Sequence, residues 1–232
     1  MIVAVHQPQF MPWLGYFDKM DQADCFVVLD VVQFKKNEWQ NRNRIKAVSG
    51  LQWLTVPVLH QFPSRLLDVQ VNRAVRWQHK HLQALRTNYA RARAWAAVWP
   101  EVESLYAADP TGLVAANLAS VEWLRRRLDV NTPVVRASAM VLPEEPTARL
   151  VAICRTVGAD AYLSGADGRT YMDLSQFAAA GIDVVFQHYQ PEPYPQLFGA
   201  FASHLSAVDL VLNCGDEAGD ILRRGRRPLE TA

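Results

Sequence analysis

The sequence predicts an α/β protein with a mostly parallel sheet built from strand–helix–strand units and a helical insertion at about residues 73–130. The first observation behind this prediction is that short apolar runs alternate with amphipathic segments along nearly the whole chain. The second is length, because 232 residues fit around one hydrophobic core and no low-complexity linker divides them. We therefore expect one domain over residues 1–232.

The first strand–helix–strand unit lies at the amino terminus. Met1–Val5 is an unbroken apolar run that suits a buried strand, and Cys25–Leu29 is a second one. Between them, Pro12–Asp21 carries large apolar residues at helical spacing after a proline in the first turn. The further expected strands are Trp53–Leu59, Thr132–Arg136, Ala161–Leu163 and Asp183–Gln187. The further expected helices are Arg73–Arg86, Ala90–Leu105, Thr111–Leu128, Thr147–Val157, Leu174–Ala180 and Phe201–Val211.

Composition excludes several classes of protein. A net charge of +1 gives no general attraction to nucleic acid or to an anionic membrane. The three cysteines form no CxxC pair, and the apolar start of the chain is too short for a secretion signal or a membrane span. Metal-ligand spacing is missing as well. We therefore expect a cytoplasmic protein with no membrane span and no metal.

Polar side chains follow the first two expected strands. His6 and Gln7 come directly after the first, and Asp30 and Gln33 follow the second. Open parallel sheets bind their ligands beyond the carboxyl ends of the strands, so these residues are candidates for a site. A His6–Asp30 pair would fix the imidazole tautomer and raise its basicity, as a general base requires. Alternatively, His6 binds a neighbouring carbonyl and Asp30 caps a turn.

A basic segment comes next. Five cations and one acid, Glu38, lie between Lys35 and Lys46, interleaved with amide side chains. Guanidinium forks and amide donors suit phosphate or carboxylate groups, and an aromatic ring can stack on a base or sugar. The alternative is a solvated basic surface. The ligand-binding residues expected in this segment are Lys35, Trp39, Asn41, Arg42, Asn43 and Arg44.

A third candidate is the loop that follows the expected strand Ala161–Leu163. Its glycines permit close approach of the backbone to a ligand, although the spacing is not that of a Walker A motif. The alternative is an ordinary tight turn between strand and helix. If the loop is functional, Ser164 should lie with His6 and Asp30 at one edge of the sheet.

The runs HQPQFMPWLGYFDKM, ADCFVVLDVVQFKKNEWQNRNRIK, WLTVPV, YLSG and HLSAVDLVLNCG make the chain similar to the WbqC-like family, from Val5 to about Ala218. The resemblance implies an association with surface polysaccharide and nucleotide-linked sugars. The positions that match the family's motifs are His6, Gln7, Pro8, Asp30, Gln33, Lys35, Asn41, Arg42, Asn43, Ser164, Gly165, Tyr171 and Gln196.

A weaker resemblance links the amino-terminal unit to the opening of HUP-type nucleotidylyltransferases, which have a Rossmann-like sheet. Those enzymes carry paired histidines, whereas this chain has only His6 followed by Gln7. The ATP chemistry of that class is therefore in doubt here.

Together these features favour a transferase that N-acylates or aminoacylates the amine of a nucleotide-linked amino sugar, in surface-polysaccharide (O-antigen) biosynthesis. His6 with Asp30 would deprotonate the amine. We expect no tightly bound cofactor, an acyl-CoA or aminoacyl-tRNA donor as co-substrate, and no other nucleic acid partner. The alternatives are a non-catalytic module that binds a nucleotide or glycan and an ATP-dependent nucleotidylyltransferase. The sequence leaves the oligomeric state open.

Overall fold

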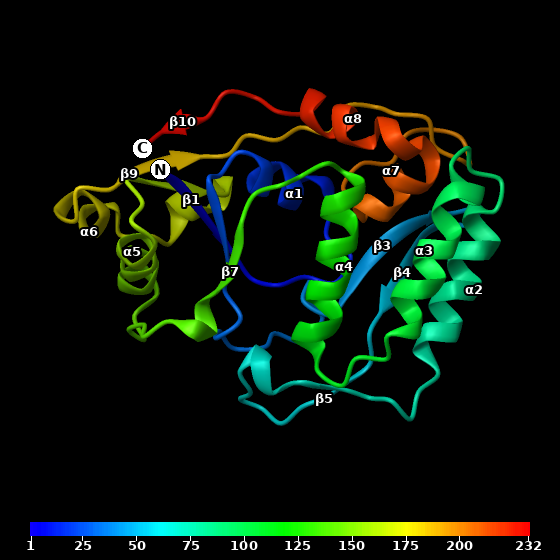
Figure 1. Cartoon of the computed structure of the whole chain (residues 1–232), viewed down its shortest axis with the longest axis horizontal. Coiled ribbons are helices and arrows are strands. Elements are labelled where there is room, and N and C mark those ends of the chain that lie inside the picture. Colours follow the sequence, from blue (N-terminus) through cyan, green and yellow to red (C-terminus); the bar gives the residue numbers. More distant parts are fainter.

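The computed structural model describes all 232 residues and centres on a six-stranded sheet with strand order β10-β9-β8-β1-β2-β7 (Figure 1). All neighbours in this sheet are parallel except β10, which is antiparallel to β9. The α/β class with a mostly parallel sheet is thus confirmed. The strands are β1 (Ile2–His6), β2 (Cys25–Val28), β7 (Val134–Arg136), β8 (Ala161–Ser164), β9 (Asp183–Phe186) and β10 (Glu230–Thr231).

The two faces of the sheet are buried against different helices. Along β1, Val3 and Val5 face the core beneath α5 (Pro146–Val157) and α6 (Leu174–Ala179). Ala4 faces the opposite side, where α1 (Leu14–Asp21) packs. Both faces are covered, which explains why β1 and β2 are continuous apolar runs rather than alternating ones.

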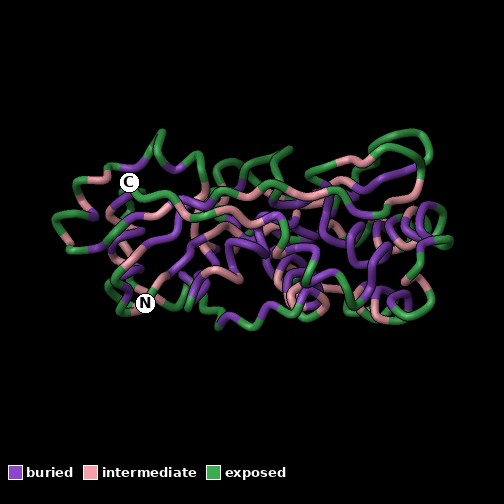
Figure 2. Tube along the Cα trace, turned by 90° about the horizontal axis from the view of Figure 1, so that it is seen from above, coloured by how far each residue is buried: buried purple, intermediate pink, exposed green.

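A helical part extends from one end of the sheet, so that the molecule is elongated (Figures 1 and 2). It contains α2 (Trp77–Tyr89), α3 (Trp95–Ala107) and α4 (Leu113–Arg127), which lie within the expected insertion. It also takes in α7 (Ala207–Cys214) and α8 (Ala218–Arg224) from the carboxyl-terminal region, together with the hairpin of β3 (Arg42–Ala47) and β4 (Gly50–Thr55). No helix combines the length and apolarity that crossing a membrane would require.

Several expected elements have different bounds; the helix expected over Ala90–Leu105, for example, begins at Trp95. The strand expected over Trp53–Leu59 is divided into β4 and β5 (Val58–Leu59), and β5 pairs with β6 (Gln70–Val71). Pro57 lies at the break, where a residue without an amide hydrogen cannot continue the ladder. The last expected helix, Phe201–Val211, begins only at Ala207. Its start is set by the Ser206 side chain, which accepts a hydrogen bond from the Val208 amide at 3.3 Å.

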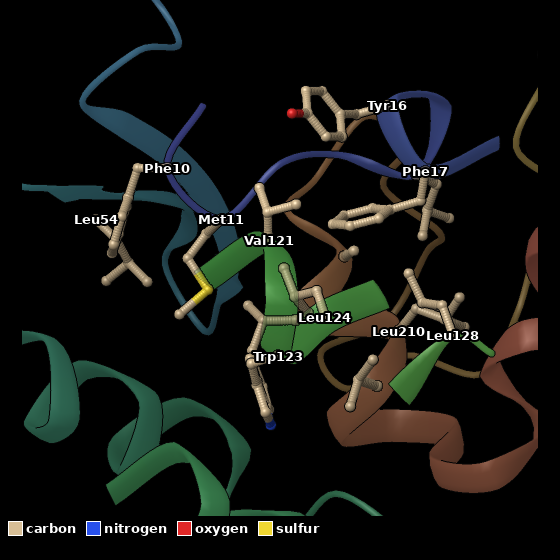
Figure 3. Packing of buried hydrophobic residues seen from close by; sticks show 14 of the residues in the cluster. Phe10, Met11, Tyr16, Phe17, Leu54, Val121, Trp123, Leu124, Leu128 and Leu210 are labelled. Atoms are coloured by element: carbon tan, nitrogen blue, oxygen red, sulfur yellow. The ribbon is translucent and has the colours of Figure 1, made fainter. Parts of the chain in front are cut away.

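The buried segment between β1 and α1 joins the two parts of the molecule. Met11 is fully buried and has a φ of 46°, which is unusual for a large side chain. Its amide donates to Ser120 Oγ on α4 at 3.0 Å, and its carbonyl accepts from Asn43 Nδ2 on β3 at 2.8 Å. Val121 and Leu124 of α4 pack nearby (Figure 3). Side chains of the helical part therefore satisfy the backbone of this segment.

Asn117 on α4 has a similar role in the same region. It is fully buried, and its Nδ2 donates to the carbonyl of Pro8 at 3.2 Å and to that of Gln40 at 2.8 Å. One amide thus connects the segment after β1 to the basic segment before β3.

Replacing Asn117 should destabilise the whole fold. Asn117→Ala leaves two buried carbonyls without a donor, and we expect the free energy of unfolding to fall by about 1–3 kcal/mol. Chemical denaturation measures this change. Asn131→Ala, at an exposed asparagine, is the control and should alter stability by less than about 0.5 kcal/mol. Equal effects of the two substitutions would contradict the role given to Asn117.

Candidate functional site

A cavity of about 880 Å³ opens at the carboxyl ends of β1 and β8. Its lining combines residues after β1, side chains of α1, the loop after β8 and Trp39 from the basic segment. The volume is in the range of small-molecule sites, and the position is the one where open parallel sheets bind ligands. It is therefore our candidate site.

His6 lies in this cavity with one ring nitrogen free. Its Nδ1 is 3.0 Å from the carbonyl oxygen of Gln7. Since a carbonyl only accepts, Nδ1 carries the proton, which leaves Nε2 with an unused lone pair. Burial, with a contribution from the nearby charge of Lys19, lowers the pKa of His6 to about 4. The imidazole is neutral at physiological pH.

Lys19 on α1 lines the same cavity and was not among the residues predicted from the sequence. It is 4% exposed, and Nζ donates to the carbonyl of Val5 at 2.9 Å with no carboxylate partner. Burial lowers the pKa of Lys19 to about 7. A large fraction of this amine is therefore uncharged near neutral pH, so it can accept a proton.

Two polar atoms around the cavity have no partner within the protein. The Tyr16 hydroxyl and Gln9 Oε1 are both buried without a hydrogen bond, although both residues line the cavity. Buried polar groups are rarely left unsatisfied, so a ligand with polar groups is the natural partner.

The helix that carries Tyr16 and Lys19 is fixed by charges from the far end of the chain. Arg226 Nε lies 2.9 Å from the buried carboxylate of Asp18, and Arg223 Nε lies 3.0 Å from Asp21. Gln187, after β9, donates to Asp18 at 2.6 Å. These contacts use up the acidic side chains of α1, so none is left to pair with Lys19.

An aromatic group forms another wall of the cavity. The Trp13 ring stacks on His204 at a centroid distance of 5.0 Å and meets Tyr189 edge to face at 5.8 Å. A Cβ on Gly15 would lie 2.2 Å from the Trp13 ring, so only glycine permits this position of the indole. The wall offers ring faces to a ligand with apolar or aromatic parts.

Six of the predicted site residues line the cavity: His6, Gln7, Lys35, Trp39, Gly165 and Tyr171. Two of them are linked through Gln40, which donates to Gln7 Oε1 at 2.7 Å and accepts from the Lys35 amide at 2.8 Å. Lys35 and Arg149 are the cations at the cavity besides Lys19, and Asp167 is its one carboxylate. This balance favours an anionic ligand.

Asp30 does not pair with His6. The backbones of His6, Asp30 and Ser164 do follow three adjacent strands at one edge, as the sequence predicts, since His6 is in register with Val28. The Asp30 carboxylate, however, accepts from Arg136 Nε at 2.7 Å and from the amide and hydroxyl of Ser138. It is fully buried and turned toward β7, which makes it a structural ion-pair residue.

The remaining predicted residues lie outside the cavity lining. Asn41 and Asn43 are buried. Asn41 Nδ2 donates to the backbone carbonyl of Val56, and Asn43 Nδ2 donates to that of Met11. Gln196 donates to the buried carboxylate of Asp209, and Ser164 Oγ bonds the carbonyl of Gly165. Gln33 is exposed at a bridge to Arg65. Arg42 and Arg44 lie on β3, in its hairpin with β4.

The sequence gives only a weak indication that Lys19 is a buried cation of the site. It lies between Phe17 and Met20 on a short helix that is otherwise almost fully buried, so a cation there lacks an obvious route to solvent. From the sequence, Asp18 and Asp21 nevertheless appear close enough to form ion pairs with Lys19. The tertiary structure shows that both carboxylates form ion pairs with arginines instead.

The unpaired Lys19 should reduce stability in a pH-dependent way. The pKa of Lys19 is about 7 in the folded protein against 10.5 in the unfolded chain. Between these values only the unfolded chain binds the proton, so the free energy of unfolding rises with pH and the penalty is complete below pH 7. Lys19→Met removes the penalty. We expect its stability relative to wild type to be about 2.7 kcal/mol more favourable at pH 6 than at pH 9.

Urea unfolding of both proteins at pH 6 and pH 9 measures this contrast. Lys36→Met, at an exposed lysine of the basic segment, is the control for loss of a charge that is not buried. A stability difference between Lys19→Met and wild type that does not change with pH would show that Lys19 keeps its proton in the folded protein.

Comparison with known proteins agrees with the sequence resemblance. An uncharacterized protein of Mycobacterium tuberculosis is 33% identical over 229 residues, which cover 97% of this chain and 99% of that protein. No solved structure matches. The pattern of the WbqC-like protein family matches residues 7–221, which include α1 and the lining of the cavity from Gln7 to His204. The chain belongs to the WbqC-like protein family.

Proposed function

We propose that the protein is a transferase that N-acylates or aminoacylates the amine of a nucleotide-linked amino sugar in surface-polysaccharide biosynthesis. The observation that carries this proposal is the presence of two uncharged bases, His6 and Lys19, in one cavity of about 880 Å³. Acyl transfer to an amine requires removal of a proton, and groups that are neutral near pH 7 can accept one.

The rest of the cavity suits the other parts of such a substrate. Neither Lys35 nor Arg149 has a carboxylate partner. Arg149 Nε and Nη2 donate to the carbonyls of Pro143 and Glu144, which leaves Lys35 and Arg149 Nη1 for a diphosphate. Trp13, Tyr171 and Tyr189 can contact a base or sugar ring, and the unpaired Tyr16 hydroxyl can bind a sugar hydroxyl. These features support a ligand that is anionic at one end and a hydroxyl-rich ring at the other.

Lys19 is a stronger base than His6 in this environment. The attacking group is a primary ammonium at neutral pH, with a pKa near 8 for an amine close to electron-withdrawing groups. An imidazole with a pKa of about 4 is a poor acceptor for that proton, whereas Lys19, at about 7, is closely matched. The free Nε2 lone pair of His6 can still accept a hydrogen bond from the same ammonium and orient it. We therefore assign Lys19 as the base and His6 as the group that positions the amine.

The step balances with these two residues. Lys19 Nζ takes a proton from the sugar ammonium, and the freed amine attacks the donor carbonyl carbon. A carbon–nitrogen bond forms and the bond to the thiolate or ribose oxygen of the donor breaks. The leaving group receives the proton from the Lys19 ammonium, which restores the neutral amine. The second proton that the attacking nitrogen loses as the amide forms passes to solvent, so that each turnover releases one proton.

Replacement of Lys19 should abolish most of the turnover. We expect Lys19→Gln to lower kcat by about 10²–10⁴, the usual contribution of a positioned base. In the wild type, kcat should rise through a pKa near 7 as Lys19 loses its proton, and the variant should lack this rise. His6→Gln should reduce kcat less and keep the rise near pH 7, because an amide oxygen still accepts a hydrogen bond.

The assay combines nucleotide-linked amino sugars with acyl-CoA or aminoacyl-RNA donors, and mass spectrometry identifies the N-acylated product. The matched control is the same sugar nucleotide with its amine already acetylated, which should bind but not react. Binding of the free-amine sugar without turnover for any donor would overturn the transferase assignment in favour of a binding module.

A further inference from the structure

The hairpin of β3 and β4 has one face that is open to solvent and rich in arginine and tryptophan. The strand register places Arg42 opposite Thr55 and Arg44 opposite Trp53. Alternate residues point the other way, so that Asn43 and Leu54 are buried in the core. The alternation of this short sheet thus separates an apolar inner face from a cationic, aromatic outer face.

Trp39 completes this outer face. Its ring centroid is 5.5 Å from that of Trp53, with 38° between the two planes. The Arg42 guanidinium lies 4.2 Å from the Trp53 centroid, and that of Arg44 lies 5.4 Å from Trp39 and 5.5 Å from Trp53. We call Trp39, Arg42, Arg44 and Trp53 the hairpin platform. Its indoles remain 38% and 41% exposed, so their free surfaces can accept a further ring.

The positive charge of the platform is not neutralised by the protein. No ion pair of the molecule includes Arg42, Arg44 or the adjacent Lys35 and Lys36. Arg42 donates to the backbone carbonyl of Asn37, and the Nε atoms of both arginines are buried without any partner. Guanidinium groups held on aromatic rings with no carboxylate nearby are suited to phosphate.

The platform adjoins the cavity. Trp39 belongs to the platform and also lines the cavity, whereas Arg42, Arg44 and Trp53 do not line the cavity. A ligand stacked on the platform would therefore have its end at the cavity mouth, where it could approach His6 and Lys19.

We propose that the hairpin platform binds the single-stranded 3′ end of an RNA that carries an aminoacyl ester, and so selects the donor for the transfer. Two neighbouring indoles can stack more than one base, and the unpaired cations Arg42, Arg44 and Lys36 suit a chain of phosphates better than a single nucleotide. The net charge of +1 is compatible with this assignment, because the cations are gathered on one face. The proposal rests on the proposed transferase function for the identity of the ester, while the binding of RNA can be tested without it.

The test uses the full-length protein and a short fluorescent RNA hairpin with a single-stranded four-nucleotide 3′ extension, in a fluorescence anisotropy titration. The dissociation constant should rise with salt, as expected for about two to four phosphate contacts. Trp53→Ala should weaken binding about 5- to 100-fold, the range for loss of a stacked base. Arg44→Gln should weaken it about 10-fold and lower the salt slope by about one contact.

The matched control is Arg86→Gln. Arg86 also lies over an indole, that of Trp99 at 5.1 Å, but it lies on α2 and is paired with Glu103. Binding that is unchanged in Arg86→Gln and weakened in the two platform variants supports the proposal. A blunt RNA duplex that binds as well as the extended hairpin would overturn it, since general electrostatic attraction would then suffice. Coenzyme A that displaces the RNA at equal or lower concentration would overturn the choice of RNA.

Failure of this proposal is distinguishable from failure of the transferase function. Transfer from acyl-CoA by a protein that does not bind the RNA would keep the function and remove the platform as a donor site. Platform-dependent RNA binding without transfer from any donor would keep the RNA site and remove the transferase.

Discussion

The structure depends on hydrogen bonds to the backbone amides and carbonyls of the buried segment between β1 and α1. A buried peptide group without a partner costs about as much as a lost hydrogen bond, and this segment runs where neither sheet nor helix can supply one. Asn117, Ser120 and Asn43 provide the partners, and they come from α4 and β3 in the helical part. The two parts of the molecule are therefore tied together at the segment that also forms the cavity. The hydrogen bonds from Asn117, Ser120 and Asn43 thus hold the two parts together and also fix the segment that lines the cavity.

A second consequence of this arrangement is that α1 is buried on almost every side. Its acids Asp18 and Asp21 obtain charged partners from Arg226 and Arg223 of the carboxyl-terminal region. Lys19 obtains only a carbonyl, so its ammonium form is unfavourable and its pKa falls. Arginine can keep its charge when buried in such pairs, whereas lysine loses its proton readily. The same helix thus holds stable ion pairs and a reactive amine.

The cavity and the hairpin platform divide the recognition of charge between them. The cavity carries few charges, and burial lowers the pKa of both of its bases, to about 4 for His6 and about 7 for Lys19. The platform concentrates cations on aromatic rings at the surface, where binding of phosphate does not require burial of charge in the core. Trp39 belongs to both regions, and under the proposed function the two regions bind the two ends of one reaction.

The sequence alone determined the α/β class, most strand and helix positions and the placement of His6 at the carboxyl edge of the sheet, because apolar periodicity and strand ends are local properties of the chain. It also selected Gln7, Lys35, Trp39, Gly165 and Tyr171 as candidate ligand-binding residues, and the structure places all five at the cavity. Only the tertiary structure decided which polar residues are free. Asp30 is bound to Arg136, and Asn41, Asn43 and Gln196 satisfy buried groups, while Lys19 is left without a carboxylate. The physical reason is that a side chain's availability depends on partners more than a hundred residues away, as with Asp18 and Arg226, and no local pattern records them.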